Sequence, residues 1–161
     1  MFPLHLLESY IQENKGDIVE IGAGYGEHTL EFLQLAEKYN RDVVVIDPFN
    51  NDMPETYRYD FSIFWDKVKE YSINLIVHKK TSLCKTSEEI CKREIAFAYV
   101  DGLQFKGAVL NDLRIVSHAS IICVDDMDRE TEESQVPSAV YDFIKQTGKN
   151  LLILERWAII K

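Results

Sequence analysis

The chain has 161 residues, about the length of one domain. Hydrophobic residues make up 46% of it and charged residues 28%, which excludes a disordered, collagen-like or coiled-coil architecture. The net charge of −9 at pH 7 opposes unaided binding to the phosphate backbone of a nucleic acid. No apolar run approaches the roughly 18 residues of a membrane span. Neither a nucleic acid nor a membrane is therefore an expected partner.

The cysteines and the N-terminus indicate the cellular compartment. The three cysteines, Cys84, Cys91 and Cys123, are odd in number and lack C-x-x-C spacing, so they indicate neither a zinc site nor a disulfide framework. The N-terminus has neither the basic region nor the long apolar stretch of a signal peptide. These features predict a protein of the reducing cytoplasm.

Short β-rich segments alternate with helical patterns, which is typical of a parallel sheet covered by helices. The first 16 residues are expected to be a short helical segment, with a helix over residues 4–13. Strands are predicted at residues 17–21, 42–46, 74–78, 95–100, 120–124, 151–154 and 157–160. Helices are predicted at residues 28–39, 59–71, 87–93, 107–116 and 138–146, and polar loops at 50–55 and 128–135.

The last two predicted strands are separated by only two residues, so they are expected to pair as an antiparallel hairpin. The chain has no internal repeat, low-complexity tract or linker. Residues 1–161 are therefore predicted to form a single α/β domain.

A glycine-rich turn, E-I-G-A-G-Y-G at residues 20–26, joins the first predicted strand to the next helix. Glycines let the backbone bend sharply and approach a ligand closely, and ligands of open α/β sheets lie beyond the carboxyl ends of the strands. A nicotinamide-binding fingerprint needs a small residue at position 27, where this chain has Glu27. A nicotinamide or nucleotide-sugar enzyme is thus a weaker alternative, beside a turn that binds no ligand.

Acidic residues follow the second, fourth and fifth predicted strands. Asp47 lies about 20 residues after the glycine-rich turn, where an acidic side chain can accept the hydroxyls of a ribose. Asp101 and the pair Asp125 and Asp126 would converge if their strands were neighbours, because adjacent strands lie about 4.8 Å apart. Carboxylates that close need neutralising, and Mg²⁺ prefers hard oxygen ligands. Solvated loop aspartates are the alternative at these positions.

The residues V-E-I-G-A-G-Y-G at 19–26 resemble motif I of class I S-adenosylmethionine-dependent methyltransferases. Y-V-D-G at 99–102, D-L at 112–113 and C-V-D-D at 123–126 are similar to the macrocin O-methyltransferase-like group, which is related in architecture to catechol O-methyltransferases. The resemblance runs from about residue 17 to the C-terminus. It implies a three-layer Rossmann-like α/β fold, in which a seven-stranded, mostly parallel sheet has an antiparallel last strand. It also implies that the strands ending at Asp101 and Asp125 are neighbours.

The same resemblance implies roles for individual residues. S-adenosylmethionine would contact Glu20, Gly22, Gly24, Gly26, Asp47, Thr81, Ser82 and Asp101. The three glycines would line its methionine portion, Glu20 would support its amino-acid end, Asp47 would bind the ribose, and the Thr-Ser pair would contact the adenine. Asp101, Asp125 and Asp126 would hold Mg²⁺.

These features predict a transferase of the EC 2.1.1 class, an S-adenosylmethionine-dependent O-methyltransferase that acts on a small hydroxylated molecule with help from Mg²⁺. The metal would bind the acceptor oxygens and lower the pKa of the hydroxyl. A carboxylate of the pair Asp125 and Asp126, or metal-bound hydroxide, would take the proton. Lys106 is a further candidate for this role.

Two features depart from the family pattern. Related sequences often carry D-G-D-H-S-Y after the fourth strand, whereas this chain has D-G-L-Q-F-K at 101–106, with Gln104 in place of the histidine. Glutamine cannot accept a proton at neutral pH, and the segment before the sheet is shorter than the additions that enclose the substrate in many relatives. The site is thus expected to be open, or completed by a second chain in a homo-oligomer. A catalytically silent cofactor-binding or interaction domain of the same fold is the alternative function.

Overall fold

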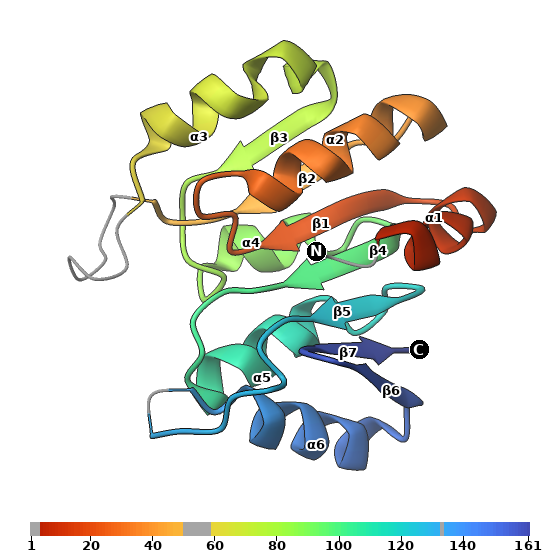
Figure 1. Cartoon of the computed structure of the whole chain (residues 1–161), viewed down its shortest axis with the longest axis vertical. Helices are drawn as coiled ribbons and strands as arrows, with labels where there is room; N and C mark the ends of the chain where they lie inside the picture. The colour runs from red at the N-terminus through yellow and green to blue at the C-terminus, as the bar shows by residue number, and fades with distance from the viewer. Residues whose placement is uncertain (1–3, 50–58, 133) are drawn as a thin grey trace.

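A computed structural model describes residues 4–49, 59–132 and 134–161 of the chain. Strands in this part form one sheet in the order β3-β2-β1-β4-β5-β7-β6 (Figure 1). Neighbouring strands from β3 to β5 pair in parallel, while β7 pairs antiparallel with both β5 and β6. The strands are β1 (Asp17–Ile21), β2 (Val43–Ile46), β3 (Leu75–His78), β4 (Ile95–Val100), β5 (Ile122–Val124), β6 (Leu151–Leu154) and β7 (Trp157–Ile160).

Helices cover both faces of the sheet and complete the predicted three-layer fold. One core cluster joins the sheet to α1, α2 and α3, and the other joins it to α4, α5 and α6. No helix in the described ranges is both long and apolar enough to cross a bilayer. The helices are α1 (Leu4–Glu13), α2 (Glu27–Tyr39), α3 (Phe61–Val68), α4 (Lys85–Ile90), α5 (Lys106–Ile115) and α6 (Val136–Thr147), and the 3₁₀ helix η2 (Lys69–Asn74) extends α3.

The central strand β4 shows why these residues form a sheet buried on both faces. All six of its side chains are buried. Successive side chains point to opposite faces of a strand, so Phe97 and Tyr99 pack in the layer of α1 to α3, whereas Ala98 and Val100 pack in the layer of α4 to α6. A strand covered on both faces is apolar throughout, as parallel sheets require.

The predicted elements are present, and the differences lie at their ends. The predicted helix at 59–71 ends as an α-helix at Val68 and continues as η2, where the Ser72 hydroxyl donates to the Lys69 carbonyl at 2.8 Å. Such side-chain bonds to the backbone compete with the α-helical pattern. The loop at 128–135 is irregular wherever it is described, whereas the predicted loop at 50–55 lies outside the described residues.

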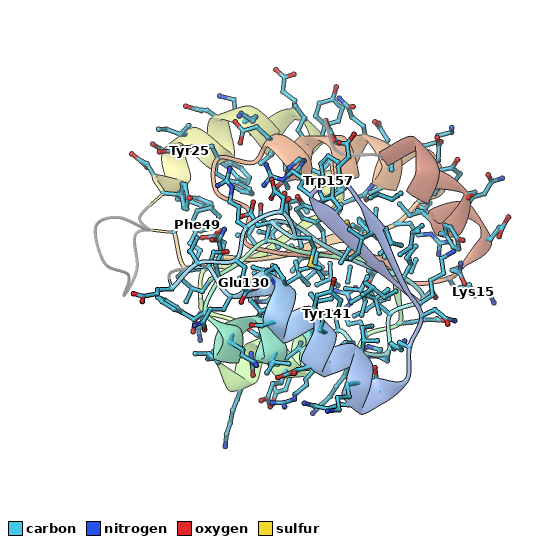
Figure 2. All side chains as sticks on the ribbon, turned by 60° about the horizontal axis from the view of Figure 1, so that its bottom comes forward. Lys15, Tyr25, Phe49, Glu130, Tyr141 and Trp157 are labelled. Atoms are coloured by element: carbon cyan, nitrogen blue, oxygen red, sulfur yellow. The ribbon has the colours of Figure 1, made fainter. Side chains whose placement is uncertain are left out.

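The parallel strands all end at the same side of the sheet, here called the carboxyl edge. The turn between β6 and β7, formed by Glu155 and Arg156, also lies there, because β7 runs antiparallel to β5 and pairs Ala158 with Val124. Figure 2 shows Tyr25 and Phe49 on one side of the molecule and Lys15 at the opposite side. The carboxyl edge therefore gathers loop residues that are far apart in the sequence.

Phe32 of α2 tests the packing of this core. Its ring is fully buried and lies 5.4 Å from the ring of Phe97 and 5.5 Å from that of Tyr99, centroid to centroid. We expect Phe32→Ala to lower the free energy of unfolding by about 3–5 kcal/mol in urea denaturation, because it removes this burial and leaves a cavity. Tyr141→Ala, at a side chain that is 53% exposed, should change it by less than about 0.5 kcal/mol. Equal effects of the two substitutions would contradict the packing described here.

Candidate functional site

A cavity of about 600 Å³ opens at the carboxyl edge, beside the ends of β1, β2 and β4. Its volume lies within the roughly 300–1,000 Å³ that is usual for small-molecule sites. Two of the predicted cofactor residues, Glu20 and Gly26, are not among the residues that line it. The other six are, namely Gly22, Gly24, Asp47, Thr81, Ser82 and Asp101.

Two glycines of the turn after β1 are required for different reasons. Gly22 has a φ of +86°, and a Cβ built on it would lie 2.1 Å from the carbonyl oxygen of Asp101. Gly26 has a φ of +82°, and a Cβ there would lie 2.9 Å from Cδ2 of Phe64. Gly22 therefore lets the ends of β1 and β4 meet beneath the cavity, whereas Gly26 lets α3 pack against the start of α2.

Asp47 ties the glycine-rich turn to the end of β2. Its Oδ2 accepts hydrogen bonds from the backbone N–H groups of Ala23 at 2.8 Å and Gly24 at 3.1 Å, and its Oδ1 accepts one from Phe49 at 2.6 Å. Burial raises the pKa of Asp47, and these backbone donors oppose the rise. Since a carboxylate has about four lone-pair sites, roughly one remains for a ligand.

Glu20 lies behind the turn rather than in the cavity. Its side chain is 1% exposed, and the Thr29 hydroxyl of α2 donates to its Oε2 at 2.5 Å. Burial raises the pKa of Glu20 to about 8 against the effect of the Thr29 hydrogen bond, and the nearby carboxylates of Asp101 and Asp47 raise it further. Glu20 is therefore largely protonated at neutral pH and supports the turn from inside the fold.

Asp101, at the end of β4, brings a carboxyl group into the cavity. Burial raises its pKa to about 8, and the negative charges of Asp125 and Asp126 add to this effect while Arg156 opposes it. Because β4 and β5 are adjacent, with Val100 opposite Val124, the prediction that these strands are neighbours is confirmed.

Asp112, on α5, is a buried carboxyl group that also lines the cavity. Burial raises its pKa to about 6, and hydrogen bonds with the side chains of Ser82 and Asn111 oppose the rise. In the sequence Asp112 was part of a motif without a role of its own. In the structure it faces the same cavity as Ser82.

Asp125 and Asp126 form a closed hydrogen-bonded network beside the cavity. Nε of Arg156 lies 2.5 Å from Oδ1 of Asp125, and Nη2 of Arg156 pairs with Oδ1 of Asp126. The Tyr99 hydroxyl donates to Oδ2 of Asp125 at 2.7 Å, and Nε2 of Gln104 donates to Oδ2 of Asp126. Every carboxylate oxygen of the pair therefore has a donor within the protein.

This network does not fit the predicted Mg²⁺ site. Mg²⁺ takes hard oxygen ligands, and each of the four oxygens of Asp125 and Asp126 already accepts a hydrogen bond, which leaves fewer lone pairs for a metal ion. Arg156 also places a positive charge against both carboxylates, where it would repel a divalent cation. Within residues 4–49, 59–132 and 134–161, no group of three His, Cys, Asp or Glu side chains is arranged to hold a metal ion.

The structure does not bring Lys106 into the cavity. Lys106 starts α5, and its Nζ lies 2.6 Å from Oδ2 of Asp142 on α6. It is not among the lining residues. The position therefore joins two helices of one layer and gives no support to the predicted role in catalysis.

Several lining residues had no firm role in the sequence analysis. Tyr25 and Tyr59 pack edge to face with their ring centroids 5.0 Å apart, and both line the cavity together with His28. Glu27, which weighs against a nicotinamide cofactor, also lines it and pairs with Lys67 of α3. The helical pattern could place His28 near the turn, but nothing in the sequence pairs the two tyrosines.

Comparison with known proteins identifies the fold. No family model and no curated protein matches this sequence. The apo structure of CalS11, a TDP-rhamnose 3′-O-methyltransferase of calicheamicin biosynthesis, is similar with a TM-score of 0.76 at 17% identity, over 99% of this chain and 76% of that one. An O-methyltransferase from Bacillus cereus in complex with SAH has a TM-score of 0.63 at 16% identity, over 99% and 80% of the two chains.

The O-methyltransferase TomG from Streptomyces achromogenes, involved in tomaymycin synthesis and in complex with SAM, has a TM-score of 0.63 at 11% identity. That likeness covers 96% of this chain and 77% of TomG. This chain therefore has the three-layer Rossmann-like fold of S-adenosylmethionine-dependent methyltransferases, and the predicted fold is confirmed.

Glu20 gives a test of the electrostatics of this site. Between the ordinary pKa of 4.5 and about 8, the folded state keeps a proton on Glu20 that the unfolded state releases. The free energy of unfolding of the ligand-free protein should therefore fall as the pH rises through this window. In urea denaturation, Glu20→Gln should remove part of this pH dependence. At pH 8 its free energy of unfolding should exceed that of the wild type, by at most about 4 kcal/mol.

Glu37→Gln, at an exposed carboxylate on α2, is the matched control and should keep the wild-type pH dependence. A Glu20→Gln profile parallel to that of the wild type would show that Glu20 ionises in the folded state as it does in the unfolded chain.

Proposed function

We propose that residues 1–161 form a single methyltransferase domain that uses S-adenosylmethionine to methylate an oxygen of a small hydroxylated molecule. The observation that carries the proposal is the cavity, whose lining joins the turn after β1, the end of β2, the segment after β3 and the end of β4. These are the positions at which the motif resemblance puts the methionine, ribose and adenine parts of the cofactor. The three O-methyltransferase structures support the same assignment.

The residues of the cavity fit this cofactor. Gly22 and Gly24 line the cavity and carry no side chain, so the methionine portion can lie close to the backbone at these two positions. Asp47 can accept about one hydrogen bond beyond those it already receives, so we assign it one ribose hydroxyl rather than both. Thr81 and Ser82 remain the proposed adenine contacts. When bound, S-adenosylmethionine supplies a methyl group on a positively charged sulfur.

The acceptor is proposed to bind beside Asp101 and Gln104. Asp101 is the one member of the predicted catalytic and metal-binding set that lines the large cavity, whereas Asp125, Asp126 and Lys106 are engaged in ion pairs. We therefore assign the ionised form of Asp101 to take the proton from the acceptor hydroxyl, so turnover should rise as the pH approaches its pKa of about 8. CalS11 is described as a sugar O-methyltransferase, which supports a polar, hydroxylated acceptor for this chain as well.

Cofactor binding is tested by calorimetry with S-adenosylmethionine. We expect the wild-type protein to bind, and Asp47→Asn to weaken binding by about 10-fold or more, because an amide replaces a charged acceptor that also fixes the turn. Asp42→Asn, at the opposite end of the same strand region and paired with Arg93, should bind like the wild type. Equal affinities for all three folded proteins would remove Asp47 from the cofactor site.

Turnover is tested with a panel of small hydroxylated acceptors and labelled S-adenosylmethionine. Asp101→Asn should lower kcat by about 10²–10⁴-fold, because the amide cannot take a proton, and should change cofactor affinity by only a few-fold. Asp128→Asn, at an exposed residue of the loop after β5, should keep the wild-type rate. Tight cofactor binding with no turnover on any acceptor would favour the silent binding domain instead.

A further inference from the structure

We propose that Arg156 takes the place of a divalent cation at the ends of β4 and β5, and that the chain binds no divalent ion there. The proposal deepens the proposed methyltransferase function, but its first test does not depend on activity. It starts from the four oxygens of Asp125 and Asp126, all of which accept hydrogen bonds from protein groups.

The backbone fixes Arg156 at this position. It lies in the turn of the β6–β7 hairpin, beside the end of β5, and its carbonyl oxygen accepts a hydrogen bond from the Met127 N–H at 2.7 Å. Glu155, in the same turn, has a φ of 54°, and Asp126 has a φ of 62°. Residues other than glycine hold such left-handed conformations only where the surrounding structure determines them. The turn that carries Arg156 and the strand end that carries Asp126 are therefore both locally constrained, and this fixes the position of the guanidinium.

Arg156 offsets one of the two negative charges in this network, and neutral donors bind the remaining carboxylate oxygens. Asp125 and Asp126 are each 5% exposed, and carboxylates so deeply buried need a cation or strong donors. Arg156 contacts both with two different nitrogens, and an arginine keeps its charge throughout the physiological pH range. Mg²⁺ at these oxygens would lie against the positive charge of the guanidinium, so we expect it to bind only where Arg156 is displaced and the bonds from Tyr99 and Gln104 are disturbed.

The network also reaches the cavity through Gln104, which lines it. An ionised Asp126 can only accept, so the Gln104 amide must turn its NH₂ group toward Asp126. This leaves Oε1 of Gln104, which has no hydrogen-bond partner among the described residues, to accept a bond from a second hydroxyl of the acceptor, beside the one that Asp101 deprotonates. Arg156 is therefore a positioning residue that acts on the acceptor through Asp126 and Gln104.

The direct test is the binding of Mn²⁺ alone, measured by electron paramagnetic resonance. At about 1 mM Mn²⁺ the wild-type protein should show no binding at this site, whereas Arg156→Ala frees both carboxylates and should bind Mn²⁺ with a Kd at least about 10-fold below that concentration. Adding Asp125→Asn to Arg156→Ala should abolish that gain. Arg129→Ala removes an exposed cation near Asp126 with no ion pair to it and should behave like the wild type.

Two results would overturn the proposal. One is that the wild type binds Mn²⁺ stoichiometrically and that Asp125→Asn abolishes this binding. This measurement does not require Arg156→Ala to fold. The other is folded Arg156→Ala, verified by circular dichroism, that gains no Mn²⁺ binding.

The activity arm tests the positioning role. Wild-type turnover should be unchanged in the presence of EDTA, and Arg156→Ala should raise the KM for the acceptor about 10-fold while S-adenosylmethionine affinity stays the same. Gln104→Ala should raise the KM for the acceptor by a similar factor. The double variant Arg156→Ala with Gln104→Ala should raise it little more than either single variant, because both residues act through the same hydrogen bonds. Turnover that EDTA abolishes would contradict the proposal, whereas a wild type with no turnover would refute the proposed function and leave the Mn²⁺ result intact.

Discussion

Buried carboxylates at the carboxyl edge are the constraint on which this structure depends. Parallel strands that end on one side place Asp47 and Asp101 on the lining of one cavity and Asp125 beside it, and burial of an unpaired charge is costly. The groups that stabilise the carboxylate differ from strand to strand. Backbone N–H groups of the glycine-rich turn bind Asp47, whereas the guanidinium of Arg156 and the hydroxyl of Tyr99 bind Asp125.

These hydrogen bonds and ion pairs explain how the carboxyl edge can both stabilise the fold and bind a ligand. Asp47 holds the turn in the shape that leaves Gly22 and Gly24 against the cavity, so the residue proposed to contact the ribose also builds the cofactor surface. Asp101 is less fully satisfied, and burial raises its pKa to about 8. Of these three carboxyl groups, Asp101 is the one that faces the space proposed for the acceptor.

The sequence predicted a parallel sheet covered by helices, because short β-rich segments alternate with helical patterns, and it predicted the hairpin from the two-residue link between the last two strands. The adjacency of β4 and β5 came from the family resemblance, and the pairing of Val100 with Val124 confirms it. The charge partners could not be predicted, since Arg156 is 30 residues or more along the chain from the carboxylates it contacts. The same limit applies to Lys106, whose partner Asp142 is set by the packing of α5 on α6 rather than by any motif.

The most direct measurement is a crystal structure of the wild-type protein soaked with S-adenosylhomocysteine and Mn²⁺, with anomalous data collected for manganese. We expect an adenosyl group in the cavity against Gly22, Gly24 and Asp47, Arg156 still bound to both aspartates, and no anomalous peak at the end of β5. A manganese peak between Asp101 and Asp125 with Arg156 displaced, or a nucleoside bound elsewhere, would contradict it.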